Sequence, residues 1–210
     1  MNKDSHKKVA LVIDGDFPKN QKLINQIKSS DIIIAIDGAA NILMENEITP
    51  DVAIGDFDSI DLSHKDNISI IVNAEDQNKT DLEKTLNWCI DNNHTLLSIF
   101  GISGQSEDHF LGNFFIINEY ADTIDCIIYT DYSTITPCIG DKTFDSFQGE
   151  TVSIISFEKD NKITSTNLQY PLNAYKLSPS VRAVRNTSLG ETFTIKSSDK
   201  VMVFQVKNKL

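Results

Sequence analysis

The pattern of apolar residues changes once along this chain of 210 residues, and that change limits the folds open to it. Up to about residue 130, short apolar runs alternate with longer segments of helical period, which is typical of parallel strands buried on both faces and joined by helices. After about Asp131 the segments are short and rich in β-branched residues, and no helix of ten residues is indicated. We therefore expect an α/β fold: an N-terminal doubly wound, mostly parallel sheet with flanking helices, then a small all-β, sandwich-like domain.

We expect two domains, residues 1–132 and 133–210, and the sequence pattern predicts the bounds of their strands and helices. The third helix should begin at a capping box of Thr80 and Glu83. The expected strands are Val9–Ile13, Ile32–Ile36, Val52–Ile54, Ile68–Val72, Leu96–Phe100 and Ile124–Tyr129. The expected helices are Gln21–Lys28, Ala39–Glu45, Asp81–Asn92 and Asp108–Tyr120, the last with Phe110, Leu111, Phe114, Ile117 and Tyr120 facing inward. The later β-rich segments are Thr151–Phe157, Thr192–Ile195 and Val201–Val206, the last two separated by Ser197-Ser198-Asp199.

The amino-acid composition limits which partners the protein can bind and in which cellular compartment it is expected. With 19 Lys and Arg against 30 Asp and Glu, the net charge is −11, which argues against nucleic-acid binding and against binding to an anionic membrane. No apolar run approaches the roughly 20 residues that a membrane helix needs. The three cysteines, Cys89, Cys126 and Cys138, show no C-x-x-C spacing, which favours buried free thiols in a reducing compartment. We expect a soluble, cytoplasmic protein.

Carboxylates follow two of the expected strands. Asp37 follows Ile32–Ile36, and Asp56 and Asp58 follow Val52–Ile54, whereas neither a Walker phosphate loop nor a G-x-G-x-x-G motif occurs. An Asp-x-Asp pair in a turn can direct two carboxylates at one cation, and such oxygen ligands suit Mg²⁺. In so acidic a chain a pair of this spacing also arises by chance, so a solvated loop is the alternative interpretation.

Two further acids, Asp81 and Asp108, stand at expected helix starts. Either one alone is adequately explained by its favourable interaction with the helix dipole. Carboxylates at four strand-to-helix junctions together are harder to explain as solvated loops or helix caps, because open α/β sheets bind ligands at the carboxyl ends of their strands.

Several longer motifs then occur in a fixed order through nearly the whole chain. They are Asp37-Gly38-Ala39-Ala40-Asn41, Pro50-Asp51, Gly55-Asp56-Phe57-Asp58-Ser59, Asp76 to Lys84, Gly101-x-x-Gly104, Glu107-Asp108-His109, Gly149 to Ser153 and Leu168 to Leu172. In this order they resemble the thiamine pyrophosphokinase family. The resemblance implies a homodimer with a catalytic α/β domain that binds nucleotide and metal (1–132) and a thiamine-binding and dimerisation β domain (133–210). It also implies Mg²⁺-dependent transfer of a pyrophosphoryl group from ATP to the hydroxyl of thiamine, which yields thiamine diphosphate and AMP.

The resemblance also implies roles for individual residues. The catalytic residues would be Asp56, Asp58, Asp81 and Asp108, of which Asp56, Asp58 and Asp81 would bind metal. Which of Asp81 and Asp108 accepts the hydroxyl proton is left open. Residues that would bind the substrates are Asp37, Asn41, Gln77 and Thr80 on the nucleotide side, with Ser106, His109, Arg182 and Asn186. A packing role for His109 is an equal alternative.

Two motifs depart from the family pattern. The family usually carries an Arg ahead of its Asp-His pair, where this chain has Ser106, and a Ser or Leu before the Asn that here follows Arg185. Arg182 and Arg185 are the only two arginines of the chain. We hypothesise that Arg182 or Arg185 replaces the missing guanidinium, with Arg182 the better candidate, because on a strand it would share a face with Asn186. Two ordinary surface arginines are the alternative.

Two rival functions stay open at this point. One is another Mg²⁺-dependent pyrophosphoryl transferase or a nucleotide hydrolase on the same scaffold. The other is a catalytically impaired relative that only binds nucleotide or thiamine, although a pure binder would gain little from four like charges in one cleft.

Overall fold

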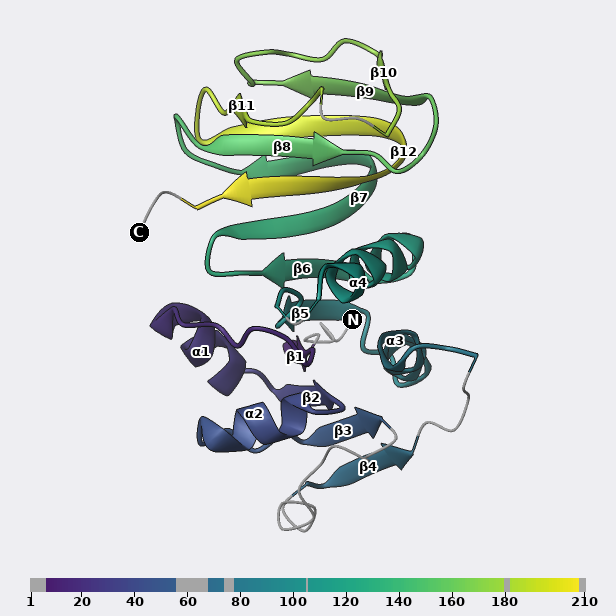
Figure 1. Cartoon of the computed structure of the whole chain (residues 1–210). Helices are drawn as coiled ribbons and strands as arrows, with labels where there is room; N and C mark the ends of the chain where they lie inside the picture. Colours follow the sequence, from purple (N-terminus) through teal and green to yellow (C-terminus); the bar gives the residue numbers. More distant parts are fainter. Residues whose placement is uncertain (1–6, 56–67, 74–77, 105, 180–181, 208–210) are drawn as a thin grey trace, which may run out of the picture. The chain divides into compact units, whose positions relative to one another are not determined.

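The computed structural model describes residues 7–55, 68–73, 78–104, 106–179 and 182–207, which fall into two compact units (Figure 1). The first unit runs to Ile116 and takes in Ile128–Asp131. The second consists of Ile117–Ile127 and the residues from Tyr132 onward. Strand β6, Asp125–Tyr129, contributes residues to both units. A separate buried apolar cluster lies in each unit.

The described strands of the first unit form a parallel sheet in the order β5-β1-β2-β3-β4. Every residue of β1 and β3 is buried, as expected for parallel strands covered on both faces. Because the strands are parallel, their carboxyl ends lie at one edge of the sheet. The expected site residues come after these strand ends, so they belong to the same edge. The strands are β1 Val9–Val12, β2 Ile32–Ile36, β3 Val52–Gly55, β4 Ile70–Asn73 and β5 Leu96–Phe100.

Helices join these strands at the expected positions. Side chains of α1 and α2 pack in one cluster with the small residues Ala10, Ala35 and Ala53 of the sheet. Thr80 and Glu83 form the expected capping box at the start of α3. No helix within the described ranges is both long and apolar enough to cross a bilayer. The helices are α1 Gln21–Lys28, α2 Ala39–Glu45, α3 Asp81–Asp91 and α4 Glu107–Glu119.

The inward face predicted for α4 is partly wrong. Phe114 and Ile117 are buried, but Phe110 is 36% and Leu111 50% exposed. The apolar residues of α4 surround the helix instead of forming one stripe, so a single packed face cannot cover all of them. The exposed pair lies in the first turns of the helix.

Antiparallel strands make up the second unit, as predicted. The long strand β12 pairs with β7 along both of its halves, and its other edge pairs first with β9 and then with β8. Phe144 of β7 and Phe193 of β12 stack in the core of this unit, with ring centroids 5.0 Å apart. The strands are β7 Ser133–Asp145, β8 Thr151–Ile155, β9 Asn161–Thr166, β10 Tyr175–Leu177, β11 Asn186–Thr187 and β12 Thr192–Val206.

The break predicted at Ser197-Ser198-Asp199 is wrong, because the two segments form the single strand β12. The pairing of β12 with β7 shifts register between Ser197 and Val201, which is a bulge and not a turn. Buried Asn161 holds the bulge: its Oδ1 accepts the Asp199 amide at 3.0 Å, and its Nδ2 donates to the Lys200 carbonyl at 3.0 Å. The backbone groups that the bulge removes from the ladder therefore keep hydrogen-bond partners.

The three cysteines are free and buried, as predicted. Burial raises the pKa of Cys89 and of Cys126 to about 12 and that of Cys138 to about 11. Because the thiolate is the reactive form, the native chain should show no titratable thiol at pH 8 with a disulfide reagent, whereas the denatured chain should show three. Rapid reaction of the native chain would contradict this burial.

Candidate active site

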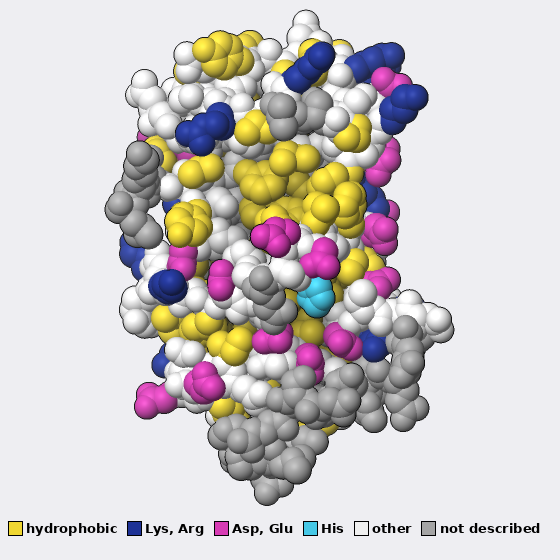
Figure 2. All heavy atoms as spheres, viewed as in Figure 1, with side chains coloured by type: hydrophobic (Ala, Val, Ile, Leu, Met, Phe, Trp, Pro, Cys, Tyr) yellow, Lys and Arg dark blue, Asp and Glu magenta, His cyan; other side chains and the backbone are white. Residues whose placement is uncertain are grey.

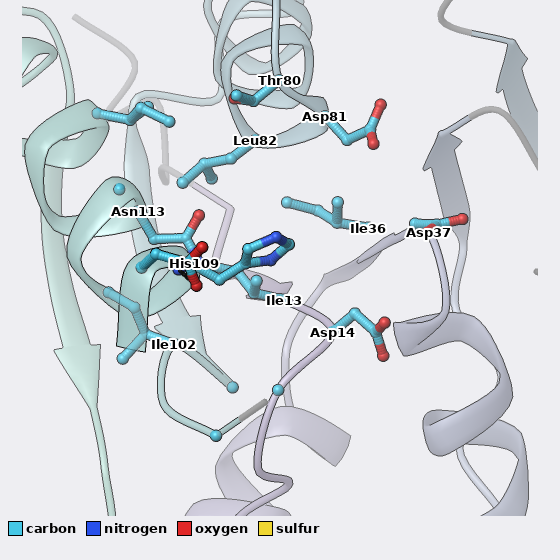
Figure 3. Close-up of a pocket in the computed structure, with 16 residues that line it drawn as sticks. Ile13, Asp14, Ile36, Asp37, Thr80, Asp81, Leu82, Ile102, His109 and Asn113 are labelled. Carbon is cyan, nitrogen blue, oxygen red and sulfur yellow. Dashed lines mark hydrogen bonds between the residues drawn. The ribbon is translucent and has the colours of Figure 1, made fainter. Parts of the chain in front are cut away.

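A cavity of about 560 Å³ opens at the carboxyl edge of the parallel sheet, within the first unit. Its walls come from the segments that follow β1, β2 and β5 and from the first turns of α3 and α4 (Figure 3). Strand ends of a parallel sheet are the usual ligand site of such folds. The polar side chains that line it are Asp14, Asp37, Thr80, Asp81, Asp108, His109 and Asn113.

Asp37 reaches this cavity from a left-handed turn. Its φ is +46°, an unusual conformation for a residue with a side chain, and its amide donates to the Ile54 carbonyl at 2.9 Å. This bond ties the end of β2 to β3. Asn41 lies four residues further on, in α2; it is half-buried and is not among the residues that line the cavity.

Thr80 and Asp81 are positioned by the capping box of α3. The Thr80 hydroxyl accepts the Glu83 amide at 3.2 Å, and the Glu83 carboxylate accepts the Thr80 amide at 2.8 Å. Lys84 lies one turn on and pairs with Asp81 at 3.0 Å. The Asp81 side chain takes no part in the cap and lines the cavity (Figure 3).

Asp108 and His109 reach the cavity from the first turn of α4. The Ser106 hydroxyl donates to the Asp108 carboxylate, and the His109 amide donates to its Oδ1 at 3.0 Å. These two hydrogen bonds lower the pKa of Asp108, with that from Ser106 the larger cause. Ser106 thus acts on the site through Asp108 and is not itself a lining residue.

The segments after β1 and β5 touch each other backbone to backbone beside the cavity. The Asp16 amide donates to the Ser103 carbonyl at 2.5 Å. A Cβ at Gly15 would lie 2.3 Å from the carbonyl oxygens of Gly101 and Ser103, so this approach is possible only with glycine. The two segments therefore form one wall of the cavity.

The cavity thus brings together five of the predicted site residues: Asp37, Thr80, Asp81, Asp108 and His109. Asp56, Asp58 and Gln77 lie outside the described residues. Arg182 and Asn186 belong to the second unit.

The side chain of Asn186 is buried and hydrogen-bonded within its own unit. Its Oδ1 accepts the Tyr170 amide at 3.0 Å, and its Nδ2 donates to the Tyr170 carbonyl at 2.7 Å. The expectation that Arg182 and Asn186 share a strand is wrong: β11 begins at Asn186, whereas Arg182 lies in a turn and donates to the Tyr175 hydroxyl at 3.4 Å. Its proposed role as a replacement guanidinium stays a prediction.

Asp14 and Asn113 also line the cavity and were not predicted from the sequence. Asp14 carries the same signal that identified Asp37, an Asp-Gly pair directly after a buried strand, and could have been found by it. Asn113 lies on α4 one turn after His109, and only the folded helix shows that both face the cavity (Figure 3).

The side chains that line the cavity carry negative charge and, among the described residues, no Lys or Arg. Figure 2 shows acidic side chains gathered on the face that it presents. Among the described residues no three His, Cys, Asp or Glu are grouped closely enough to hold a metal. Carboxylate oxygens such as those of Asp81 are the donors that Mg²⁺ prefers, but the described residues do not by themselves complete a metal site.

Two family models match the chain one after the other. The catalytic domain of thiamin pyrophosphokinase matches residues 23–128, and the substrate-binding domain of thiamin pyrophosphokinase matches residues 134–204. The chain belongs to the thiamin pyrophosphokinase family. This confirms the resemblance, and the family is one of enzymes.

Individual members of the thiamin pyrophosphokinase family agree with this assignment. The thiamine pyrophosphokinase of Bacillus subtilis strain 168 is 30% identical over 149 residues, which cover 67% of this chain and 70% of that protein. Thiamin pyrophosphokinase 1 of Caenorhabditis elegans is 21% identical over 193 residues, 83% of this chain and 79% of that protein.

Solved structures of the family share the fold. The crystal structure of the Bacillus subtilis thiamine pyrophosphokinase has a TM-score of 0.80 at 23% identity, with 97% of this chain and 100% of that chain covered. That of a thiamin pyrophosphokinase family protein from Enterococcus faecalis has a TM-score of 0.82 at 18% identity, with 96% and 100% covered. The predicted fold class is confirmed.

Proposed function

We propose that the chain transfers a pyrophosphoryl group from ATP to the hydroxyl of thiamine and releases AMP and thiamine diphosphate. The observation that carries the proposal is the succession of the catalytic and substrate-binding family models along one chain. The acidic cavity at the strand ends supports it, because phosphoryl transfer depends chiefly on positioning and on cancelling charge.

Mg²⁺ would be held by Asp56, Asp58 and Asp81, of which only Asp81 lies in the described part of the chain. A bound Mg²⁺ would cancel charge on the triphosphate and favour attack at its β-phosphorus. The chain's own residues then orient the substrates. Asp37, Asn41, Gln77 and Thr80 bind the nucleotide side, with His109 beside the phosphates and Ser106 acting through its hydrogen bond to Asp108. Asp108 stays ionised and accepts a hydrogen bond from the thiamine hydroxyl.

We assign the two halves of the chain different tasks in this proposal. Residues 1–132 form the catalytic domain, which binds nucleotide and metal, and residues 133–210 form the thiamine-binding and dimerisation domain of a homodimer. Asn186 and Arg182 act from the second of these. The three buried thiols suit a reducing cytoplasm, where we expect the enzyme to work.

Removing the Ser106 hydroxyl should move the acid limb of the pH–rate profile. Ser106→Ala takes away the larger cause of the lowered pKa of Asp108, so that pKa rises toward its ordinary value. Because the proposal needs Asp108 ionised, kcat/KM should begin to fall at a higher pH than in the parent, with the rate at neutral pH retained. An acid limb that stays in place would contradict the role given to Asp108. Glu107→Gln, which leaves the hydrogen bond intact, should not raise the limb.

A substrate panel tests the proposed function against its rivals. Purified chain with ATP and Mg²⁺ should release AMP only when thiamine is added, and EDTA should stop the reaction. AMP release without an acceptor would indicate a nucleotide hydrolase, and AMP release with a different alcohol would indicate another pyrophosphoryl transferase. Binding without turnover would indicate an impaired relative. The rivals are not favoured, because both family models match.

A further inference from the structure

Asp14 is a cavity residue to which neither the motifs nor the proposed mechanism gives a task. It follows β1, is half-buried and lines the cavity beside Asp37 (Figure 3). Its carboxylate lies against Gly38, the residue before α2, in the space that a side chain at position 38 would need. A Cβ built on Gly38 would stand 2.7 Å from Oδ2 and 2.9 Å from Oδ1 of Asp14, closer than real Cβ atoms come to other heavy atoms.

Space, and not backbone conformation, therefore explains the glycine at position 38. Gly38 has φ −57° and ψ −18°, a right-handed conformation that any residue adopts. What a side chain there would displace is the Asp14 carboxylate. Gly38 and Asp14 thus form a matched pair across two loops, those after β2 and β1.

The turn that this pair supports is unusual. Asp37, directly before Gly38, has φ +46°, and non-glycine residues keep such a conformation only where their surroundings enforce it. On one side stands the end of β3, where a Cβ at Gly55 would lie 3.1 Å from the Asp37 Cα. On the other side stands the Asp14 carboxylate. The turn carries Asp37 into the cavity and begins the helix that bears Asn41.

We propose that Asp14 is a positioning residue for the nucleotide. Its carboxylate, seated on Gly38, holds the left-handed Asp37 turn and thereby places Asp37 and Asn41 toward ATP. The inference rests on the proposed function in taking ATP as the ligand. Asp14 then acts through the fit of its side chain against Gly38, a role distinct from the metal-binding role given to Asp56, Asp58 and Asp81.

A double-mutant cycle tests the pair. Asp14→Ala should raise the KM for ATP about tenfold with kcat within about twofold, the pattern expected when ground-state binding is lost. Asp14→Asn, which keeps the size and polar atoms of the side chain, should stay within about threefold of the parent. Gly38→Ala should raise KM as Asp14→Ala does, because the new methyl displaces the carboxylate. The double variant should be no worse than Asp14→Ala, since contacting residues couple.

Several results would overturn the inference. An unchanged KM for ATP in Asp14→Ala would do so. An equal rise of KM in Asp14→Asn and Asp14→Ala would also do so, because it would show that the negative charge of Asp14 is what matters. Additive effects in the double variant would also contradict the pairing. Glu45→Ala, at the exposed far end of the same helix, is the matched control and should keep the parent's KM.

Calorimetric titration with Mg²⁺ and ATP gives the same cycle in Kd without turnover. If the Kd for ATP changes among the variants as predicted for KM, but the parent forms no thiamine diphosphate, the result contradicts the proposed function and supports the role of Asp14. If the parent forms thiamine diphosphate, but the Kd for ATP is the same in all variants, the result contradicts the role of Asp14 alone.

Discussion

Replacing Asp81 by Asn should lower thiamine-dependent AMP release by about 100-fold or more, the loss typical when a group that stabilises the transition state is removed. Asp81 lines the same cavity as Asp37 and Asp14, and we assign it to the metal. Asparagine keeps the size of the side chain and removes only its charge. The loss should therefore appear in kcat, measured at saturating ATP and thiamine.

Folding should survive this change, because the cap of α3 is made by Thr80 and Glu83 and not by the Asp81 side chain. The Asp81 carboxylate pairs with Lys84 at 3.0 Å, and a partly exposed pair of this kind contributes little to stability. Asp91→Asn is the matched control: it removes the same carboxylate charge from the exposed far end of α3, and kcat should be kept. A fully active Asp81→Asn would remove Asp81 from the metal site.

Phe193→Ala should destabilise the second unit by about 3–5 kcal/mol, the range for deleting a buried aromatic ring. Phe193 is fully buried and stacks on Phe144 at an interplanar angle of 7°. A unit of this size buries few large aromatic side chains, so the cavity left by the substitution should loosen the packing of its whole core. Denaturant unfolding followed by far-ultraviolet circular dichroism measures the loss.

Phe147 provides the control for this truncation. It lies in the same unit and is 40% exposed, so Phe147→Ala should change stability by no more than about 0.5 kcal/mol. Equal losses from Phe193→Ala and Phe147→Ala would contradict the core described for the antiparallel unit. A small loss from Phe193→Ala would do the same.

The α/β half was predictable because its signals are local. Runs such as Ile32–Ile36 are buried on both faces and therefore apolar at every position, and Thr80 with Glu83 marks a helix start in the sequence itself. The same rule, an Asp after a buried strand, located Asp37 and would have located Asp14. The side of α4 that faces inward could not be predicted, because apolar residues surround that helix.

The β half was predicted in type but not in detail, because its pairings are long-range. Strand β7 contains Pro137 and Gly140, which interrupt a strand pattern, and its pairing with the distant β12 overrides them. The Ser197-Ser198-Asp199 segment has the composition of a turn, but buried Asn161 holds it as a bulge. The position of Arg182 in a turn depends on where β11 begins, which residue spacing alone does not indicate.

The products of one reaction show whether this chain is an ATP-dependent thiamine pyrophosphokinase. Purified chain is incubated with ATP, thiamine and Mg²⁺, and the nucleotide and thiamine products are separated and quantified together. A thiamine pyrophosphokinase should form AMP and thiamine diphosphate in equal amounts, with no ADP. Thiamine monophosphate with ADP, or AMP formed equally well without thiamine, would contradict it.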